Sequence, residues 1–186
     1  MKKIVLTGGP CSGKTTLIRA LEKYSFPVVH ETARDVLNSY AHLPANTTKY
    51  EDIQKDIFAA QLTRENDVFS SARDTCFLDR SLIDIVAYSN KFNVSMPCAL
   101  RQIDLSKRYD AVFFLERLPF QKDSCRIESD DIEAEKIHNS LWHTYSKYFS
   151  PILVPRLSVG ARIDFIMEYI QKMKGGEIDG RMLRAK

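Results

Sequence analysis

The amino-acid sequence predicts a three-layer α/β domain, in which a five-stranded parallel sheet lies between helices on both faces. Two observations lead to this prediction. Short, nearly continuous apolar runs alternate along the chain with longer segments whose apolar residues recur at helical spacing. A glycine-rich turn joins the first apolar run to the first helical segment. Such runs are typical of strands buried on both faces of a parallel sheet, and their alternation with helices predicts right-handed βαβ units.

The strands are expected where the apolar runs lie. These runs are "KIVLT", "PVVH", "TCFLD", "DAVFFL" and "PILV", at residues 3–7, 27–30, 75–79, 110–115 and 151–154. Ligands of such sheets bind beyond the carboxyl ends of the strands. Functional side chains are therefore expected just after residues 7, 30, 79, 115 and 154.

Helices are expected at residues 13–24, 49–71, 131–149 and 159–173, with another in "RSLIDIVAY" after Asp79. The 49–71 segment places Ile53, Ile57 and Ala60 on one stripe, with Arg64 in line. Asp130 is a candidate N-cap for the third of these helices, with Glu133 three positions on, and Ser158 for the fourth.

Length and composition indicate one soluble domain. The chain has 186 residues, enough for one substantial core, and we expect a single domain over residues 1–173 with a loosely held tail over residues 174–186. Its net charge of +3 comes without a dense basic stripe, so we expect no nucleic-acid partner. No apolar run reaches the length of a membrane helix, and the chain is expected to be cytoplasmic. The four cysteines form no CxxC, which argues against zinc and against a disulfide framework.

The glycine-rich turn is the strongest functional signal. Gly8, Gly13, Lys14 and Thr15 fit the pattern G-x-x-x-x-G-K-[ST], directly after a strand and directly before a helix. Glycines bring backbone N–H groups close to phosphate oxygens, the lysine adds a charge for the β- and γ-phosphates, and the threonine hydroxyl can bind Mg²⁺. The sequence thus predicts a P-loop NTPase domain that binds a nucleoside triphosphate with Mg²⁺. The expected nucleotide-binding residues are Gly8, Gly9, Pro10, Cys11, Ser12, Gly13, Lys14, Thr15 and Thr16.

A second metal-side group is expected at the tip of the third strand. Asp79 ends "TCFLD", where a carboxylate can hold Mg²⁺ together with Thr15, directly or through water. The alternative is that Asp79 caps the helix that follows it. Glu116, which ends "VFFLE", is a competing carboxylate and is otherwise an exposed loop residue.

The acceptor of the phosphoryl group is expected to meet polar groups near the other strand tips. Glu31 could bind or deprotonate an acceptor hydroxyl, with Arg34 beside it, or the two could form a local ion pair. Arg80 could orient the acceptor or a phosphate. Gln61 and Arg64 could line the acceptor pocket from the 49–71 helix, or simply lie on its polar surface.

The connector after the fourth strand is expected to be a mobile lid over about residues 116–130. Its basic residues are Arg117, Lys122 and Arg126, and Arg126 is the strongest candidate to close on the transferring phosphoryl group. A solvated charged loop is the alternative. His42, His138 and His143 show no ligand spacing, and Trp142 is expected to pack rather than to stack on a ligand.

Several segments together resemble a known family. "LTGGPCSGKTTLIRALEKYSFPVVHETARDVL", "FAAQLTREN", "CFLDRSLIDIVAY", "YDAVFFLE" and "VPRLSVGARIDFIMEYI" are similar to the small single-domain P-loop ATPases grouped with the ribosylnicotinamide-kinase domain of the NAD-biosynthesis regulator. The resemblance implies a parallel sheet of order 2-3-1-4-5 and a mobile lid. It implies that the 8–16 loop binds the triphosphate and that Asp79 and Arg80 face the metal and the acceptor. It also implies that Glu31 and Arg34 border the acceptor pocket and that "VPRLSV" passes the adenine.

The chemistry expected from these residues is phosphoryl transfer. We expect an ATP-dependent kinase with a small, nucleoside-like acceptor, in which Lys14, Asp79, Arg80, Glu31 and Arg126 carry the reaction. One alternative is a regulatory ATPase or nucleotide-dependent module that acts on a protein partner. Another is a nucleotide kinase or phosphohydrolase, since Arg34, Arg64 and Arg80 could bind a monophosphate. A GTP switch is disfavoured because "SNKFN" lacks the aspartate that would read guanine.

Overall fold

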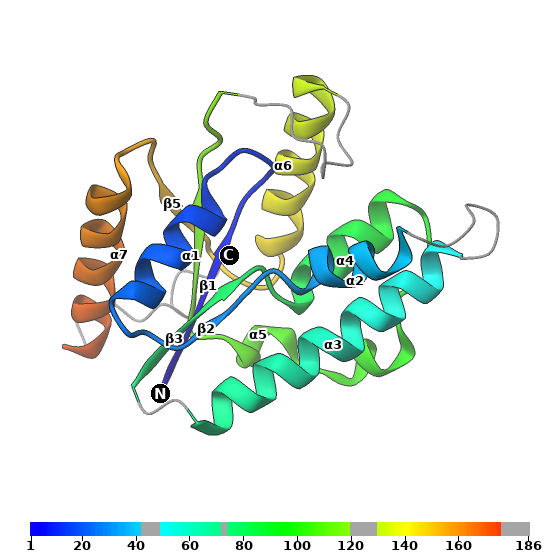
Figure 1. The fold of residues 1–186 in the computed structure, drawn as a ribbon, viewed down its shortest axis with the longest axis horizontal. Coiled ribbons are helices and arrows are strands. Elements are labelled where there is room, and N and C mark those ends of the chain that lie inside the picture. Colours follow the sequence, from blue (N-terminus) through cyan, green and yellow to red (C-terminus); the bar gives the residue numbers. More distant parts are fainter. Residues whose placement is uncertain (42–48, 72–73, 120–129, 176–186) are drawn as a thin grey trace.

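A computed structural model of the chain describes residues 1–41, 49–71, 74–119 and 130–175. Its sheet has five parallel strands in the order β2-β3-β1-β4-β5, which confirms the predicted fold class and strand order (Figure 1). The strands are β1 (Lys2–Thr7), β2 (Val28–Val29), β3 (Thr75–Asp79), β4 (Ala111–Leu115) and β5 (Ile152–Val154). Each lies within about one residue of its predicted range.

The expected helices are present, and three short elements were not anticipated. The helices are α1 (Lys14–Lys23), α2 (Thr32–Tyr40), α3 (Tyr50–Ser71), α4 (Leu82–Lys91), η1 (Cys98–Gln102), α5 (Leu105–Arg108), α6 (Asp131–Tyr145) and α7 (Val159–Lys174). The unexpected ones are α2, η1 and α5. The third predicted helix ends at residue 145 rather than 149, because the chain continues in turns there.

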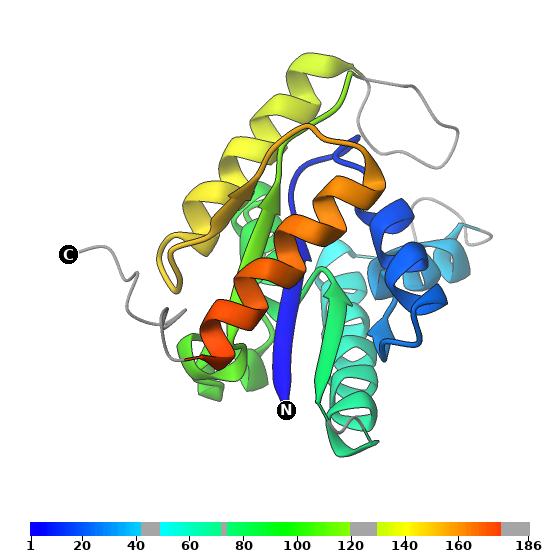
Figure 2. The same ribbon diagram turned by 90° about the vertical axis from the view of Figure 1, so that its left-hand side faces the viewer.

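Alternate residues of the central strand face two separate cores. Ile4 and Leu6 of β1 pack with residues of α1 and α7, whereas Val5 packs with residues of α3, α4 and α6. Successive side chains of a strand point to opposite faces, so a strand buried on both faces must be apolar throughout. Figure 2 shows α7 and α1 together on one face of the sheet. This explains why the apolar runs were recognisable in the sequence.

The helix starts decide one open alternative. The predicted caps are confirmed, because Asp130 accepts from the Glu133 N–H at 2.8 Å and Ser158 accepts from the Ala161 N–H. Helix α4 is capped by Ser81, in a reciprocal capping box with Asp84. Asp79 is therefore not the cap of α4, and its carboxylate remains at the tip of β3.

The buried stripe of α3 differs from the predicted one. Ile57 is buried as expected, but Ile53 and Ala60 are only partly buried. The other buried residues are Gln54, Phe58, Gln61 and Glu65. The apolar pattern did not predict this stripe because polar residues can be buried when they find partners. Glu65 accepts a hydrogen bond from the Tyr109 hydroxyl at 2.9 Å and another from Arg108 Nε at 2.7 Å. The buried face of α3 thus contains polar as well as apolar residues.

Within the part of the chain that the structure describes, no helix has the length and apolar character that crossing a membrane requires.

The end of β1 makes a close approach that only glycine allows. Gly8 has φ 142°, and a Cβ there would lie 2.6 Å from the Leu115 carbonyl oxygen of β4. We predict that Gly8→Ala lowers the free energy of unfolding by about 2 kcal/mol or more, measured by chemical denaturation. Gly160→Ala in α7 is the control, because a Cβ there meets nothing within 4 Å. Equal stability of the two variants would contradict the account.

Candidate functional site

The 8–16 loop consists of the turn between β1 and α1 and the first residues of α1, and it encloses a lysine. Lys14 is the first residue of α1 and is only 6% exposed. Its Nζ donates to the Gly8 carbonyl at 2.8 Å, to the Gly9 carbonyl at 2.9 Å and to Ser12 Oγ at 3.1 Å. Burial, and after it the positive charge of Arg80, lowers the pKa of Lys14 to about 8. The ammonium group therefore sits inside the turn, beside the first N–H groups of α1, which have no partner within the helix.

The outer side of the loop is bonded to other elements. Four successive residues, Gly9 to Ser12, each have a backbone group that a more distant residue satisfies. The Gly9 N–H donates to His138 Nδ1 (3.1 Å), and the carbonyls of Pro10, Cys11 and Ser12 accept from Arg117 Nε (3.3 Å), the Leu118 N–H (2.7 Å) and Arg162 Nη1 (2.7 Å). The loop conformation is thus imposed by α6, α7 and the segment after β4.

His138 has a role that its sequence context did not suggest. It lies on α6, with its ring edge-to-face with Phe114 at 4.8 Å between centroids. Accepting the Gly9 N–H at Nδ1 requires a neutral ring with its proton on Nε2. Burial, with the charges of Arg117 and Lys14, lowers the pKa of His138 to about 4, so the ring is neutral near pH 7.

Asp79 and Thr15 meet as the sequence predicts for a metal pair. Thr15 Oγ1 donates to Asp79 Oδ2 at 3.3 Å. Asp79 is 1% exposed, and its Oδ1 has no hydrogen-bond partner among the described residues. Burial raises the pKa of Asp79 to about 6, an effect that Lys14 opposes. A buried, unpaired carboxylate oxygen beside a hydroxyl is a donor set that suits Mg²⁺.

In the part of the chain that the structure describes, no cluster of typical metal ligands accompanies Asp79 and Thr15. Among the residues that the structure places, no three His, Cys, Asp or Glu side chains gather to hold a metal ion. Mg²⁺ commonly takes one or two protein ligands and completes its shell with water and phosphate oxygens. The geometry around Asp79 and Thr15 fits that mode of binding.

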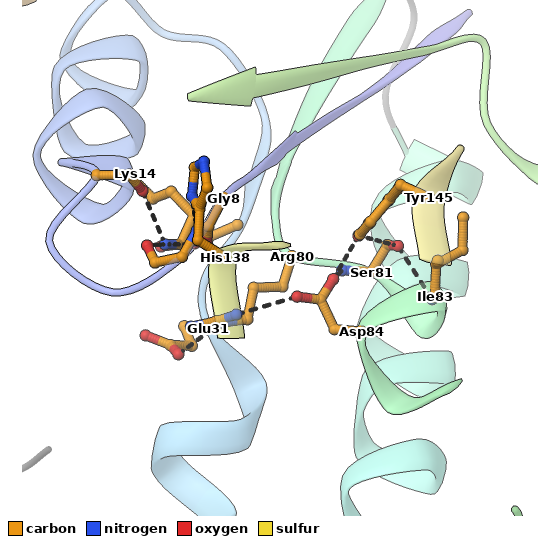
Figure 3. Close-up of polar contacts among 12 residues, drawn as sticks. Gly8, Lys14, Glu31, Arg80, Ser81, Ile83, Asp84, His138 and Tyr145 are labelled. Carbon is orange, nitrogen blue, oxygen red and sulfur yellow. Dashed lines mark hydrogen bonds and ion pairs between the residues drawn. The ribbon is translucent and has the colours of Figure 1, made fainter. Parts of the chain in front are cut away.

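Arg80 is held between two carboxylates (Figure 3). Its Nε donates to Glu31 Oε1 at 2.7 Å and its Nη1 to Asp84 Oδ1 at 3.0 Å. Arg80 directly follows β3 with φ 73°, a left-handed conformation that is unusual for arginine. Burial alone would raise the pKa of Glu31, but Arg80 and Lys14 outweigh it and lower that pKa to about 2. Glu31 is therefore a charged hydrogen-bond acceptor and a weak base.

The Arg80 network continues into α6. The Tyr145 hydroxyl donates to Asp84 Oδ2 and lies 2.7 Å from Ser81 Oγ. The Ser81 N–H also donates to Asp84 Oδ2, at 3.0 Å. Figure 3 shows these side chains converging between β3 and the neighbouring helices. Helix α6 thus touches the site twice, through His138 at the loop and Tyr145 at the strand tip.

A cavity of about 390 Å³ lies between the loop and the Arg80 network, and Asp79, His138 and Tyr145 are not among its lining residues. The phosphate loop lines one part of it, and α2, α3 and α4 line the rest. Its members include the predicted residues Glu31, Arg34, Gln61 and Arg80, together with Asn38, Tyr50, Gln54, Asp84 and Tyr88. Arg64 is not among them; its Nη1 pairs with Asp35 at 2.7 Å on the surface. Glu31 also makes the local ion pair with Arg34, at 3.4 Å.

The connector after β4 is only partly described. Arg117 is 9% exposed, and its side chain is bonded to the Pro10 carbonyl and to the Asp131 carboxylate. Lys122 and Arg126 lie outside the described residues. Glu116 accepts from the Arg156 N–H at 3.2 Å and thus faces the loop after β5 rather than the metal pair. Trp142 packs edge-to-face on Phe114, as expected.

Besides the added cavity residues and Ser81, three residues of this region were missed in the sequence: His138, Tyr145 and Arg162. A signal existed for each. His138 and Tyr145 lie seven residues apart, on the helix face that carries Leu141. Arg162 lies four residues before Ile166, on the buried face of α7. A polar residue on a buried helix face has to find a partner, but periodicity alone does not say which.

The His138 contact predicts a pH dependence of stability. A folded pKa of about 4 lies below the ordinary value of 6.5, so the unfolded chain binds the proton more tightly. Stability is then fully present above pH 6.5 and falls as the pH drops towards 4, by on the order of 2 kcal/mol after screening. His138→Asn keeps an acceptor for Gly9 but cannot titrate, so the dependence should flatten in denaturation measured from pH 4 to pH 7.5.

The exposed His143 on the same helix provides the control. His143→Asn should keep the wild-type dependence. An unchanged pH profile in His138→Asn would show that the Gly9 bond does not control it.

Comparison with known proteins agrees with this geometry. A family model described as an AAA domain matches residues 3–162. No curated protein matches the sequence. Among solved structures, NadR protein in complex with NR is similar with a TM-score of 0.71 and 19% identity, over 90% of this chain and 51% of that one. The chain thus spans about half the length of the NadR chains that it matches.

Two kinases match over nearly their whole length. Thymidylate kinase from Candida albicans has a TM-score of 0.62 at 17% identity, over 93% of this chain and 92% of that one. Deoxyadenosine kinase from M. mycoides has a TM-score of 0.57 at 16% identity, over 91% and 99%. Likeness at these identities establishes the fold. The chain belongs to the AAA domain family of the matching model, and its fold is that of a P-loop, nucleoside-kinase-like domain.

Proposed function

We propose that this chain is a kinase that binds ATP with Mg²⁺ and transfers the γ-phosphoryl group to a hydroxyl of a small, uncharged, nucleoside-like acceptor. The observation that carries the proposal is that the phosphate loop and the pair Glu31 and Arg80 line one cavity of about 390 Å³. Phosphoryl transfer needs donor and acceptor side by side. A cavity of this size suits a small molecule, and the name of the similar deoxyadenosine kinase supports a nucleoside acceptor, whereas that of thymidylate kinase names a nucleotide.

The donor half of the site consists of the 8–16 loop. The N–H groups at the start of α1 would bind the phosphates, as helix N-termini do. Lys14 would exchange its contacts with the Gly8 and Gly9 carbonyls for phosphate oxygens. Because this exchange keeps the ammonium group hydrogen-bonded in both states, Lys14 can remain buried throughout.

Asp79 and Thr15 are proposed to hold Mg²⁺. The unpaired Oδ1 of Asp79 supports this assignment. The ion would supply charge neutralisation between the β- and γ-phosphate oxygens. Thr15, at the start of α1, keeps its hydroxyl beside that carboxylate at 3.3 Å.

The acceptor hydroxyl is proposed to bind Glu31. Because Arg80 and Lys14 lower the pKa of Glu31 to about 2, we assign this carboxylate mainly to orienting the hydroxyl, with little driving force for early proton removal. A loose phosphoryl-transfer transition state does not need early deprotonation. Arg80 fixes Glu31 in place. The lid over residues 116–130 and the role of Arg126 in it remain predictions from the sequence.

The ion pairs favour an uncharged acceptor over a nucleotide. Arg34 pairs with Glu31, and Arg80 pairs with both Glu31 and Asp84. A phosphate on the acceptor would have to displace these carboxylates or lie against them, and repulsion of this kind discriminates between ligands. Arg34 and Arg80 are therefore already paired with the carboxylates of the cavity, Glu31 and Asp84.

The first test distinguishes a kinase from a regulatory ATPase. ADP and free phosphate are measured together, with Mg·ATP and pools of hydroxyl-bearing metabolites. We predict that at least one pool raises ADP without an equal rise in free phosphate. Lys14→Ala should lower this turnover by about 10²- to 10⁴-fold because it removes the charge at the β- and γ-phosphates.

Circular dichroism on Lys14→Ala checks whether the variant is folded. ADP matched by free phosphate in every pool would instead support a regulatory ATPase that acts on a protein partner. Unchanged turnover in the folded variant would refute the mechanism.

The second test concerns acceptor charge. Nucleosides are compared with their own 5′-monophosphates as acceptors at equal concentration. We predict a kcat/KM at least about tenfold higher for the nucleoside of each productive pair, since the monophosphate meets Glu31 and Asp84. A preference for the monophosphate would identify a nucleotide kinase.

A further inference from the structure

Arg162 is a buried arginine whose guanidinium bonds three backbone carbonyls. Arg162 is 3% exposed and lies in the first turns of α7. Its Nη1 donates to the Ser12 carbonyl at 2.7 Å, its Nε to the Pro155 carbonyl at 3.0 Å and its Nη2 to the Glu116 carbonyl at 3.5 Å. These carbonyls belong to the phosphate loop, the loop after β5 and the end of β4. One side chain thus ties together three segments at the carboxyl edge of the sheet.

Arg162 forms no close ion pair among the described residues, and the acid that acts on its charge, Glu116, does so from a longer distance. Among the described residues, no carboxylate oxygen lies within 4.0 Å of its guanidinium nitrogens. Buried charges are usually paired, because desolvation is costly. Carbonyl oxygens satisfy the N–H groups of Arg162 but leave its positive charge in place. Nη1 lies 3.3 Å from the position that a Cβ on Gly13 would take. A full positive charge therefore stands directly behind the residue that precedes α1.

The bond to Ser12 also sets the direction of an N–H group in the loop. In a trans peptide the C=O of one residue and the N–H of the next point in opposite directions. Because Arg162 holds the Ser12 carbonyl on the outer side, the Gly13 N–H is directed to the opposite side. Gly13 is the N-cap of α1, with φ 80°, so its peptide could otherwise turn readily.

We infer that Arg162 is a positioning residue for the nucleotide: it orients the Ser12–Gly13 peptide towards the phosphates and adds positive potential behind them. The inference rests on the proposed binding of ATP by the 8–16 loop. It concerns a residue that touches neither ATP nor the acceptor in the proposed site. Its effect should therefore appear in the affinity for ATP and not in acceptor binding.

The test measures ATP affinity by isothermal titration calorimetry in the presence of Mg²⁺. Arg162→Gln removes the positive charge and most of the hydrogen bonds to the three backbone carbonyls. It should weaken ATP binding by about 10- to 100-fold. Arg162→Lys keeps the charge but cannot bond all three carbonyls, and its ATP affinity should fall between those of Arg162→Gln and the wild type. In steady-state assays the KM for ATP should rise while the KM for the acceptor stays unchanged.

Arg108→Gln is the matched control. Arg108 is also a largely buried arginine, paired with Glu65 at 2.7 Å, but it lies before β4, at the opposite edge of the sheet. This variant should lower the melting temperature and leave ATP affinity within about twofold of the wild type, because it lies far from the loop. Loss of stability alone is thereby separated from loss of nucleotide binding.

The possible failures are distinguishable. ATP affinity of folded Arg162→Gln within about threefold of the wild type would overturn the role of Arg162 and leave the proposed function standing. If Arg162→Gln does not fold, Arg162→Lys decides, and wild-type affinity in that folded variant would overturn the role. Absence of ATP binding by the wild type would refute the proposed function itself.

Discussion

The carboxyl edge of the sheet depends on how the 8–16 loop is hydrogen-bonded. A turn that collects N–H groups on one side must direct its carbonyls to the other, and those carbonyls need donors. In this chain the donors come from Arg117, Leu118 and Arg162, which belong to segments more than 100 residues away. The loop is therefore a product of the whole domain. Its local sequence permits the turn, and its neighbours select the conformation.

The second constraint is the charge at the strand tips. Asp79, Arg80 and Asp84 crowd one end of β3, with Glu31 opposite them, and all four are largely buried. Arg80 neutralises Glu31 and Asp84, which leaves Asp79 as the carboxylate with a raised pKa and an unpaired oxygen. The surroundings thus give Asp79 and Glu31 different pKa values and different hydrogen-bond partners. Glu31 and Asp84 are charges held by Arg80 at the cavity, and Asp79 has a carboxylate oxygen without a partner among the described residues.

Much of the fold could be predicted from the sequence, and the features that could not be predicted were missed for physical reasons. The fold followed from the apolar runs, because strands such as β3 and β4 are buried throughout. The position of the glycine-rich loop at the end of β1, and of Asp79 and Glu31 near the ends of β3 and β2, followed from motifs at strand ends; their roles remain predictions. The buried stripe of α3 was predicted wrongly because it includes polar residues. Gln54 and Gln61 are buried where they line the cavity, and Gln61 also donates a hydrogen bond to Glu65. The spacing of apolar residues does not reveal such burial. His138 and Arg162 escaped because they act through backbone groups distant in sequence.

The central claim is that the N–H groups at the start of α1 bind the phosphates of ATP. The most direct measurement is an NMR titration that follows the backbone amide resonances of residues 13–16, with ATP in one series and adenosine in the other. The account predicts large shifts of these four amides with ATP and small ones with adenosine, because only ATP brings phosphates to the loop. Binding of ATP that leaves these amides unshifted and perturbs another surface would contradict it.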